Sequence, residues 1–231
     1  GRGSWGGTTA RSSHPRNDPP VHAGRSPKTM LILLVHGLGR TPVAMFGLAA
    51  HLRRAGHCTR FFGYSPTLES FPHILRRLTV RLRDLAQRKQ PVGLVGHSLG
   101  GLLLRLAVAD VPALQVHHLV TLGTPNPPAR AAVLASRLFP FRCFARSCGR
   151  FLASGVAVPS PHVPCLRVAG VAGPTGRWSH FGGEPNDGLV SVAEVRTGPE
   201  DVPLLVPALH SFLMDHPAVR AAVAAAMMTP D

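Results

Sequence analysis

Residues 92–101 read Val-Gly-Leu-Val-Gly-His-Ser-Leu-Gly-Gly, and the other motifs of the chain can be placed relative to this stretch. Its centre, residues 96–100, has the pattern Gly-x-Ser-x-Gly between an apolar run and a leucine-rich run with helical spacing. A serine on a sharp turn from a strand into a helix has a strained backbone, and side chains two positions before and after it would clash. Glycine at both positions removes that clash. The pattern therefore predicts a nucleophilic Ser98, although a glycine-rich turn with an incidental serine would also fit it.

Two further motifs accompany this stretch. Residues 35–39 read Val-His-Gly-Leu-Gly, residues 186–190 read Asn-Asp-Gly-Leu-Val, and a late histidine follows. Together these motifs resemble the α/β-hydrolase superfamily, and they are most similar to its compact bacterial lipases and esterases of the triacylglycerol lipase type. The resemblance covers about residues 29–229. It implies a serine hydrolase but does not specify a substrate.

The order of apolar and amphipathic segments predicts an α/β fold. Strand-like runs lie at residues 29–35, 57–62, 91–95, 117–122, 165–169 and 202–206. Helical patterns lie at residues 42–55, 69–88, 99–109 and 217–227, with Thr41 as a candidate N-cap of the first. Strands that alternate with helices predict a mostly parallel sheet of about six strands with helices on both faces. This is the α/β-hydrolase fold that the resemblance implies, in a minimal form.

Composition divides the chain into parts. Residues 1–28 are rich in Gly, Ser, Arg and Pro and have almost no aliphatic side chains, so we expect a disordered N-terminal tail. Residues 29–231 are expected to form the α/β-hydrolase domain. Within it, residues 127–160 interrupt the strand–helix alternation and hold several phenylalanines, which predicts a small cap or lid. Its phenylalanines would either line an acyl pocket or form the core of the cap.

Ester hydrolysis by a serine needs a base and an acid that orients the base. In open α/β sheets such groups lie beyond the carboxyl ends of the strands, in the chain order serine, acid, histidine. Asp187 follows the strand at 165–169 and is the predicted acid. Its alternative role is an Asx turn, because Asp-Gly pairs are common in turns. Glu184 and Glu194 are the rival acids.

His210 is the predicted base because it directly follows the last predicted strand. His216 is the rival, but it precedes Pro217 at an expected helix start, where Asp215 could cap the helix. The neighbouring His97 and the early His36 are expected to brace the site without taking part in the reaction.

The oxyanion hole should use two main-chain N–H groups, which are fixed before negative charge develops. One is Leu99, directly after the nucleophile, and the other is Leu38, in the loop after the first strand. Side chains matter little at these positions, so leucine is acceptable. The chemistry needs neither a metal nor an organic cofactor, and the expected substrate is a small-molecule ester or a lipid.

The same parts would also serve a thioesterase, an amidase or an acyltransferase. From a different class, a non-catalytic binding protein could keep the hydrolase fold. The sequence leaves the substrate-binding residues and the oligomeric state open.

Composition excludes some function classes. The formal net charge is +14, from 25 basic and 11 acidic residues. The arginines are scattered and no nucleic-acid-binding motif is present, so we expect no nucleic-acid partner. A basic solvated surface explains the charge, and weak peripheral contact with a lipid surface is the alternative. Residues 1–28 lack the apolar core of a signal peptide, which favours a cytoplasmic location.

The four cysteines form no dense disulfide framework. Cys58 and Cys165 lie in strand-like runs and are expected to be buried thiols. Cys143 and Cys148 are close enough in sequence for a local disulfide, although spacing alone does not establish one. A zinc site that also uses His162 is a weaker alternative.

Overall fold

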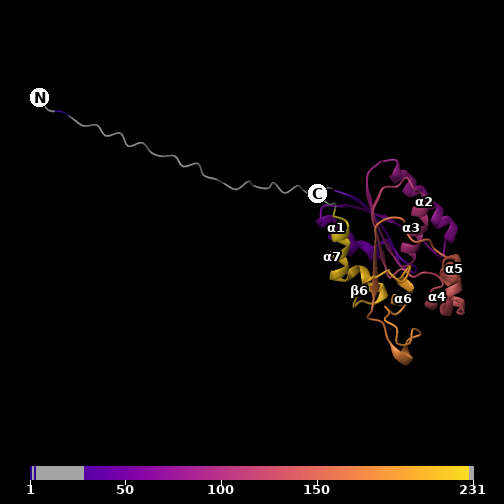
Figure 1. The fold of residues 1–231 in the computed structure, drawn as a ribbon. Helices are drawn as coiled ribbons and strands as arrows, with labels where there is room; N and C mark the ends of the chain where they lie inside the picture. The colour runs from indigo at the N-terminus through magenta and orange to yellow at the C-terminus, as the bar shows by residue number, and fades with distance from the viewer. Residues whose placement is uncertain (2, 4–28, 229–231) are drawn as a thin grey trace.

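The computed structural model describes residues 1, 3 and 29–228 (Figure 1). The predicted tail at residues 1–28 lies outside the described residues apart from Gly1 and Gly3. The described chain forms a six-stranded, all-parallel sheet of order β2-β1-β3-β4-β5-β6. Its strands are β1 (Leu31–Val35), β2 (Cys58–Phe62), β3 (Val92–His97), β4 (Val116–Leu122), β5 (Cys165–Gly170) and β6 (Leu204–Val206). The predicted fold class is therefore confirmed.

Strand ends differ from the predicted ranges for identifiable reasons. β3 continues two residues beyond the predicted end because it pairs with β4 as far as His97 and Leu122. β6 begins at Leu204, two residues later than predicted, directly after Pro203. Proline has no N–H to donate to a neighbouring strand, so it ends the ladder there.

Helices cover both faces of the sheet (Figure 1). The buried side chains of β1 and β3 are divided between the two layers. On one face α2 (Phe71–Ala86) and α3 (Leu99–Ala109) pack against side chains such as Leu33 and Leu94. On the other face α1 (Phe46–Arg54) and α7 (Pro217–Ala226) pack against side chains such as Ile32 and Val95. The continuous apolar character of β1 and β3 follows from this burial on both sides.

Helix starts are set by proline and by local caps. The first predicted helix starts as a 3₁₀ helix at Pro42–Met45, and Thr41 occupies its N-cap position without a side-chain hydrogen bond. α2 starts after Ser70, whose hydroxyl accepts the N–H of His73 at 3.4 Å. The apolar stripe of α2 is buried on the sheet, with Ile74, Leu78 and Leu82 all inaccessible to solvent. A sheet-covering helix is therefore the observed arrangement.

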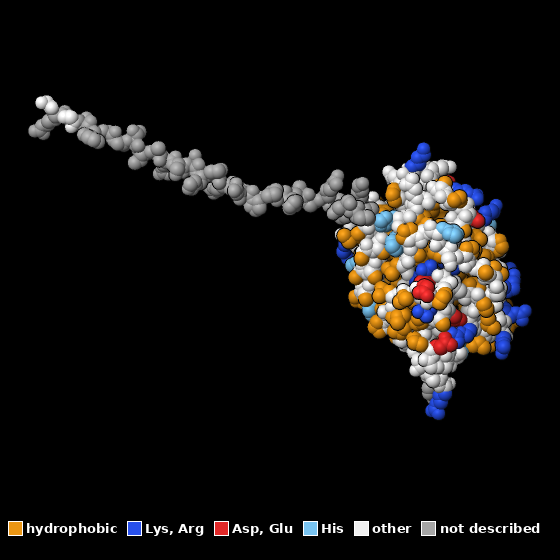
Figure 2. Space-filling view, viewed as in Figure 1, with side chains coloured by type: hydrophobic (Ala, Val, Ile, Leu, Met, Phe, Trp, Pro, Cys, Tyr) orange, Lys and Arg blue, Asp and Glu red, His pale blue; other side chains and the backbone are white. Residues whose placement is uncertain are grey.

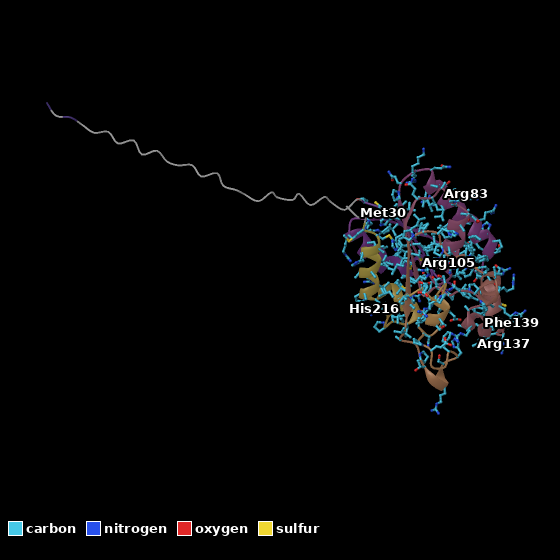
Figure 3. All side chains as sticks on the ribbon, in the orientation of Figure 1. Met30, Arg83, Arg105, Arg137, Phe139 and His216 are labelled. Atoms are coloured by element: carbon cyan, nitrogen blue, oxygen red, sulfur yellow. The ribbon has the colours of Figure 1, made fainter. Side chains whose placement is uncertain are left out.

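Residues 127–160 contain two helices that the sequence did not resolve, α4 (Arg130–Ala135) and α5 (Phe139–Ala153). α5 is interrupted at Arg146, where φ is 44° and ψ is −124°. It is attached to α2, because the Phe71 and Phe151 rings stack at 3.9 Å and the Phe71 N–H donates to Ser147 Oγ at 2.8 Å. Phe139 is 75% exposed and points outward in Figure 3. A role of this segment as a cap stays a prediction.

The described structure records all four cysteines as free thiols. The expectation of a buried Cys58 is wrong, because Cys58 is the first residue of the edge strand β2 and its side chain is exposed. Cys165 is half-buried, Cys148 is buried and Cys143 is exposed. Within residues 29–228, no three histidine, cysteine or carboxylate side chains are grouped closely enough to hold a metal ion.

Basic side chains are spread over the visible surface instead of forming one stripe (Figure 2). Several have acidic partners, as in the pair of Arg167 and Asp201 at 3.0 Å. None of the helices in the described part of the chain has the length and apolar character needed to cross a membrane.

Four histidines have pKa values below the ordinary range for histidine, chiefly because burial disfavours the charged ring. They are His36, His57, His97 and His118. In the unfolded chain each ring takes up a proton below about pH 6.5, whereas the folded protein resists that protonation. The unfolded state therefore binds more protons, and stability falls as the pH drops through this window.

We expect the thermal midpoint to fall markedly between about pH 7 and pH 5, with each fully neutral histidine contributing up to about 1.4 kcal/mol per pH unit. His57→Gln should make this dependence shallower, because His57 is buried and its Nδ1 has no partner among the described residues. His162→Gln, at an exposed position, is the control and should leave the slope unchanged. Melting curves at several pH values measure both. A flat profile, or equal slopes for the two variants, would contradict the account.

Candidate active site

Ser98 occupies the turn between β3 and α3, and its backbone is strained. Its φ is 52° and its ψ is −122°, a combination that L-residues rarely adopt. A Cβ at Gly96 would lie 2.5 Å from the Gly101 backbone, and a Cβ at Gly100 would lie 2.4 Å from the carbonyl oxygen of Val35. Neither position accepts another residue without movement of the main chain. This close approach is the physical reason for the Gly-x-Ser-x-Gly pattern.

His210 and Asp187 form a buried pair. His210 Nδ1 and Asp187 Oδ2 are 2.7 Å apart, and the two side chains are only 8% and 1% exposed. Because a carboxylate accepts hydrogen bonds, Nδ1 carries the proton and Nε2 is left as the acceptor. The Asp187 carbonyl also accepts the His210 N–H at 2.9 Å. His210 and Ser98 line one cavity, so all three predicted triad residues lie in one region.

The loop that carries Asp187 fixes the position of the carboxylate. Asp187 Oδ1 accepts the N–H groups of Leu189 at 3.0 Å and Val190 at 2.7 Å. The neighbouring Asn186 is fully buried, and its side chain makes three hydrogen bonds to the main chain of the same loop. Oδ2 is thereby directed at His210 while Oδ1 is held by the backbone.

The two rival carboxylates have other partners. Glu184 pairs with Arg130, with Oε1 2.9 Å from the guanidinium, and this hydrogen bond lowers the pKa of Glu184. Glu194 caps the short helix α6 (Val192–Val195) through a reciprocal pair of bonds with Ser191. Glu194 Oε1 accepts the main-chain N–H of Arg130 at 2.7 Å. Arg130 therefore joins α4 to the acid loop, and Asp187 alone of the three carboxylates contacts His210.

His216, the rival base, caps α7. Its Nδ1 accepts the Ala218 N–H at 3.2 Å, and it does not line the cavity beside Ser98. Figure 3 shows it at the start of α7. The expectation that Asp215 caps this helix is wrong, because Asp215 instead pairs with Arg220 at 2.8 Å.

His97 links the serine turn to the histidine loop. Its Nε2 donates to the His210 carbonyl at 3.0 Å, and the two rings lie 4.7 Å apart. Burial holds the pKa of His97 well below the ordinary range, so the ring is neutral. Its Nδ1 is buried without a partner among the described residues and faces the Gly37 backbone.

His36 holds the loop that follows β1. Its Nδ1 donates to the Gly37 carbonyl at 2.9 Å, and its Nε2 accepts the Tyr64 N–H at 3.3 Å. The Tyr64 hydroxyl donates back to the His36 carbonyl at 3.0 Å, and the two rings stack at 4.3 Å. This loop is thus tied to the segment that follows β2.

The main-chain N–H groups of Leu38 and Leu99 flank Ser98. Leu99 starts α3, so its N–H belongs to the unsatisfied first turn of the helix. Leu38 follows Gly37, where an added Cβ would lie only 2.9 Å from Ser98 Cβ. Neither N–H donates to an acceptor within the described chain. Two free donors beside a strained serine can stabilise a negatively charged oxygen.

An apolar cavity of about 290 Å³ opens at Ser98. α4 and α5 supply one wall, with Ala132, Ala135 and Phe141. The acid loop supplies Leu189 and Val190 to the lining. Phe141 thus lines the cavity, whereas Phe151 packs against α2. A role of these phenylalanines in an acyl pocket or in the core of a cap stays a prediction.

Sequence reasoning missed three residues that contact this site. Arg130 and Tyr64 carry no local signal, because their partners are distant in the sequence. Arg40 also lines the cavity. The sequence could have indicated Arg40, because it directly follows the glycine-rich motif at residues 35–39.

Comparisons with known proteins agree with this architecture. A family model described as alpha/beta hydrolase fold matches residues 31–142. The structure is similar to the mature lipase BlEst2 of Bacillus licheniformis, at 22% identity over 85% of this chain and 90% of that chain, with a TM-score of 0.64. It is also similar to the RedJ thioesterase of the prodiginine biosynthetic pathway in Streptomyces coelicolor, at 15% identity over 86% of each chain, with a TM-score of 0.58.

A third similar structure is the thioesterase domain of the curacin biosynthetic pathway, at 17% identity over 87% of this chain and 92% of that chain, with a TM-score of 0.56. None of the curated protein sequences matches significantly. At these identities the structural likeness establishes the fold. The family match over residues 31–142, the parallel sheet and the strained serine turn together show that the chain has the α/β-hydrolase fold.

Proposed function

We propose that the protein is a serine carboxylic-ester hydrolase, similar to lipases and esterases, with Ser98, His210 and Asp187 as its catalytic triad. The observation that carries the proposal is the buried hydrogen bond of 2.7 Å between His210 and Asp187, beside the cavity that exposes the strained Ser98 turn. In this proposal Ser98 is the nucleophile, His210 is the base with Nε2 as its acceptor nitrogen, and Asp187 is the acid that fixes the tautomer of the base.

In the proposed first step, Ser98 Oγ attacks the ester carbonyl carbon while its proton passes to His210 Nε2. Asp187 stabilises the imidazolium and stays ionised. The N–H groups of Leu38 and Leu99 donate to the oxyanion of the tetrahedral intermediate. The imidazolium then gives its proton to the leaving alcohol oxygen as the carbon–oxygen bond breaks, which leaves an acyl group on Ser98.

In the second step, water attacks the acyl-enzyme. His210 Nε2 takes one proton from that water, and the carboxylic acid departs as Ser98 regains its proton. The proton that Ser98 lost to the alcohol is replaced by one from the water, so the enzyme is regenerated and water is the only co-reactant. A thioester or amide would pass through the same steps, and the apolar cavity suits an acyl chain of a lipid or of a small ester.

Ser98→Ala should reduce the hydrolysis of para-nitrophenyl esters by about 10⁴-fold or more, because the covalent step is lost. The protein should stay folded, since alanine occupies the same turn. Steady-state rates and a melting curve of the purified variant measure both effects. Activity retained after clean purification would exclude Ser98 as the nucleophile.

His210→Ala should be as damaging as Ser98→Ala, because the two residues act as one unit. His216→Ala is the matched control. It should keep most of the activity and lose only helix-cap stability, about 0.5–2 kcal/mol. The reverse ranking of the two variants in kcat would assign the base to His216.

Asp187→Asn should lower kcat by roughly 10⁴-fold with a smaller change in KM, since the amide favours the wrong histidine tautomer. Glu184→Gln should keep activity within about tenfold, because it weakens only a half-exposed ion pair with Arg130. Both variants are assayed on one ester under identical conditions. An active Asp187→Asn beside an inactive Glu184→Gln would move the acid's role to Glu184.

A further inference from the structure

The cavity beside Ser98 is lined mainly by apolar side chains and contains one cation. Among the described residues that line it, Arg40 is the one Lys or Arg, and none is a carboxylate. His97, which also lines the cavity, is neutral because burial lowers its pKa. An apolar site with a single charged side chain uses that side chain to orient and select its ligand.

The charge of Arg40 has no counter-ion within the described chain. Its guanidinium donates to the main-chain carbonyl of Ser211 at 3.2 Å, and no carboxylate lies within ion-pair distance. Among the described residues, four other arginines form ion pairs with carboxylates: Arg77, Arg130, Arg167 and Arg220. Arg105, near the centre of Figure 3, is buried and surrounded by carbonyl oxygens and an amide oxygen. Arg40 is thus a cation that lines the cavity and lacks an anion.

The place of Arg40 in the fold determines which part of a substrate it would contact. Arg40 lies two residues after Leu38, and its N–H donates to the Gly37 carbonyl at 3.3 Å, so its backbone is fixed to the loop of the proposed oxyanion donor. Its side chain reaches the residue directly after His210. His210 delivers a proton to the leaving alcohol in the proposed reaction, so Arg40 lies on the leaving-group side. The apolar wall from α4 and α5 is left for the acyl chain.

We propose that Arg40 binds an anionic group, a carboxylate or a phosphate, on the alcohol part of the substrate ester. This inference rests on the proposed ester hydrolysis. The planar guanidinium pairs with the oxygens of carboxylate and phosphate groups, and the contact is strengthened where water is scarce. The substrate class is therefore an apolar acyl group esterified to an acidic alcohol or phenol.

The test compares isosteric esters that differ in charge. The anionic ester is para-butyryloxybenzoate, and its neutral partner is para-butyryloxybenzamide; para-butyryloxyphenyl phosphate extends the series to phosphate. Mono-para-nitrophenyl glutarate places the charge on the acyl side instead, and para-nitrophenyl butyrate is its neutral reference. The kcat/KM of each ester is measured for the wild type, Arg40→Gln, Arg40→Lys and Arg137→Gln.

Arg137 provides the matched control. It is exposed at the outer edge of the molecule beside α4 and α5 and does not line the cavity (Figure 3). Arg137→Gln removes the same charge, so it reports general electrostatic steering.

We expect the benzoate-to-benzamide ratio of kcat/KM to fall about 10- to 100-fold in Arg40→Gln, the size expected for a lost charged hydrogen bond. Arg40→Lys should keep part of the preference, and Arg137→Gln should keep all of it. In the wild type, kcat/KM for the benzoate and for the phosphate ester are each divided by kcat/KM for the benzamide. The larger of these two ratios identifies which anion the site prefers.

Two results would overturn the proposal. The first is an unchanged benzoate-to-benzamide ratio in Arg40→Gln; if kcat/KM falls equally for both esters, Arg40 supports the loop at Ser211 instead. The second is a preference confined to the acyl-side anion. Failure of the proposed function is distinguishable, because the wild type would then hydrolyse neither the neutral nor the anionic esters.

Discussion

The structure depends on the close approach of three backbone segments at Ser98. Glycines at 37, 96 and 100 allow the loop after β1, the serine turn and the first turn of α3 to touch one another, and an added Cβ at any of them would lie under 3.0 Å from a neighbour. This contact fixes the strained serine and the two free N–H groups in one rigid unit. Strain of about 1–3 kcal/mol at such a residue persists because surrounding packing determines it. Here β3 and the buried face of α3 supply that packing.

A second set of bonds attaches the histidine and the acid to this unit. His97 follows directly from β3 and donates to the carbonyl of His210, so the serine turn and the histidine loop are positioned together. Arg130 joins α4 to Glu184 and Glu194, which belong to the segments on either side of the Asp187 turn. The segment at residues 127–160 therefore supports the acid loop as well as the cavity wall. Changes in this segment would be transmitted to Asp187 through these bonds.

Much of the fold followed from the sequence, because the central strands β1 and β3 are apolar runs and strands alternate with helices along most of the chain. The sharp turn at Ser98 could also be predicted, because the glycines at 96 and 100 are needed where the backbone segments approach closely. Other features depend on partners far away in the chain. The pairing of Arg130 with Glu184 and of Tyr64 with His36 leaves no local pattern, and the exposure of Cys58 depends on β2 being an edge strand. α4 and α5 were missed because α4 has only six residues and α5 is interrupted by the irregular backbone at Arg146.

The central claim is that Ser98 is an activated nucleophile. The most direct measurement is mass spectrometry of the intact protein after treatment with a fluorophosphonate, followed by peptide mapping. The account predicts one adduct per chain on the peptide that contains Ser98, no adduct in Ser98→Ala, and strongly slowed labelling in His210→Ala. Absence of labelling in the folded wild-type protein, or an adduct on another residue, would contradict it.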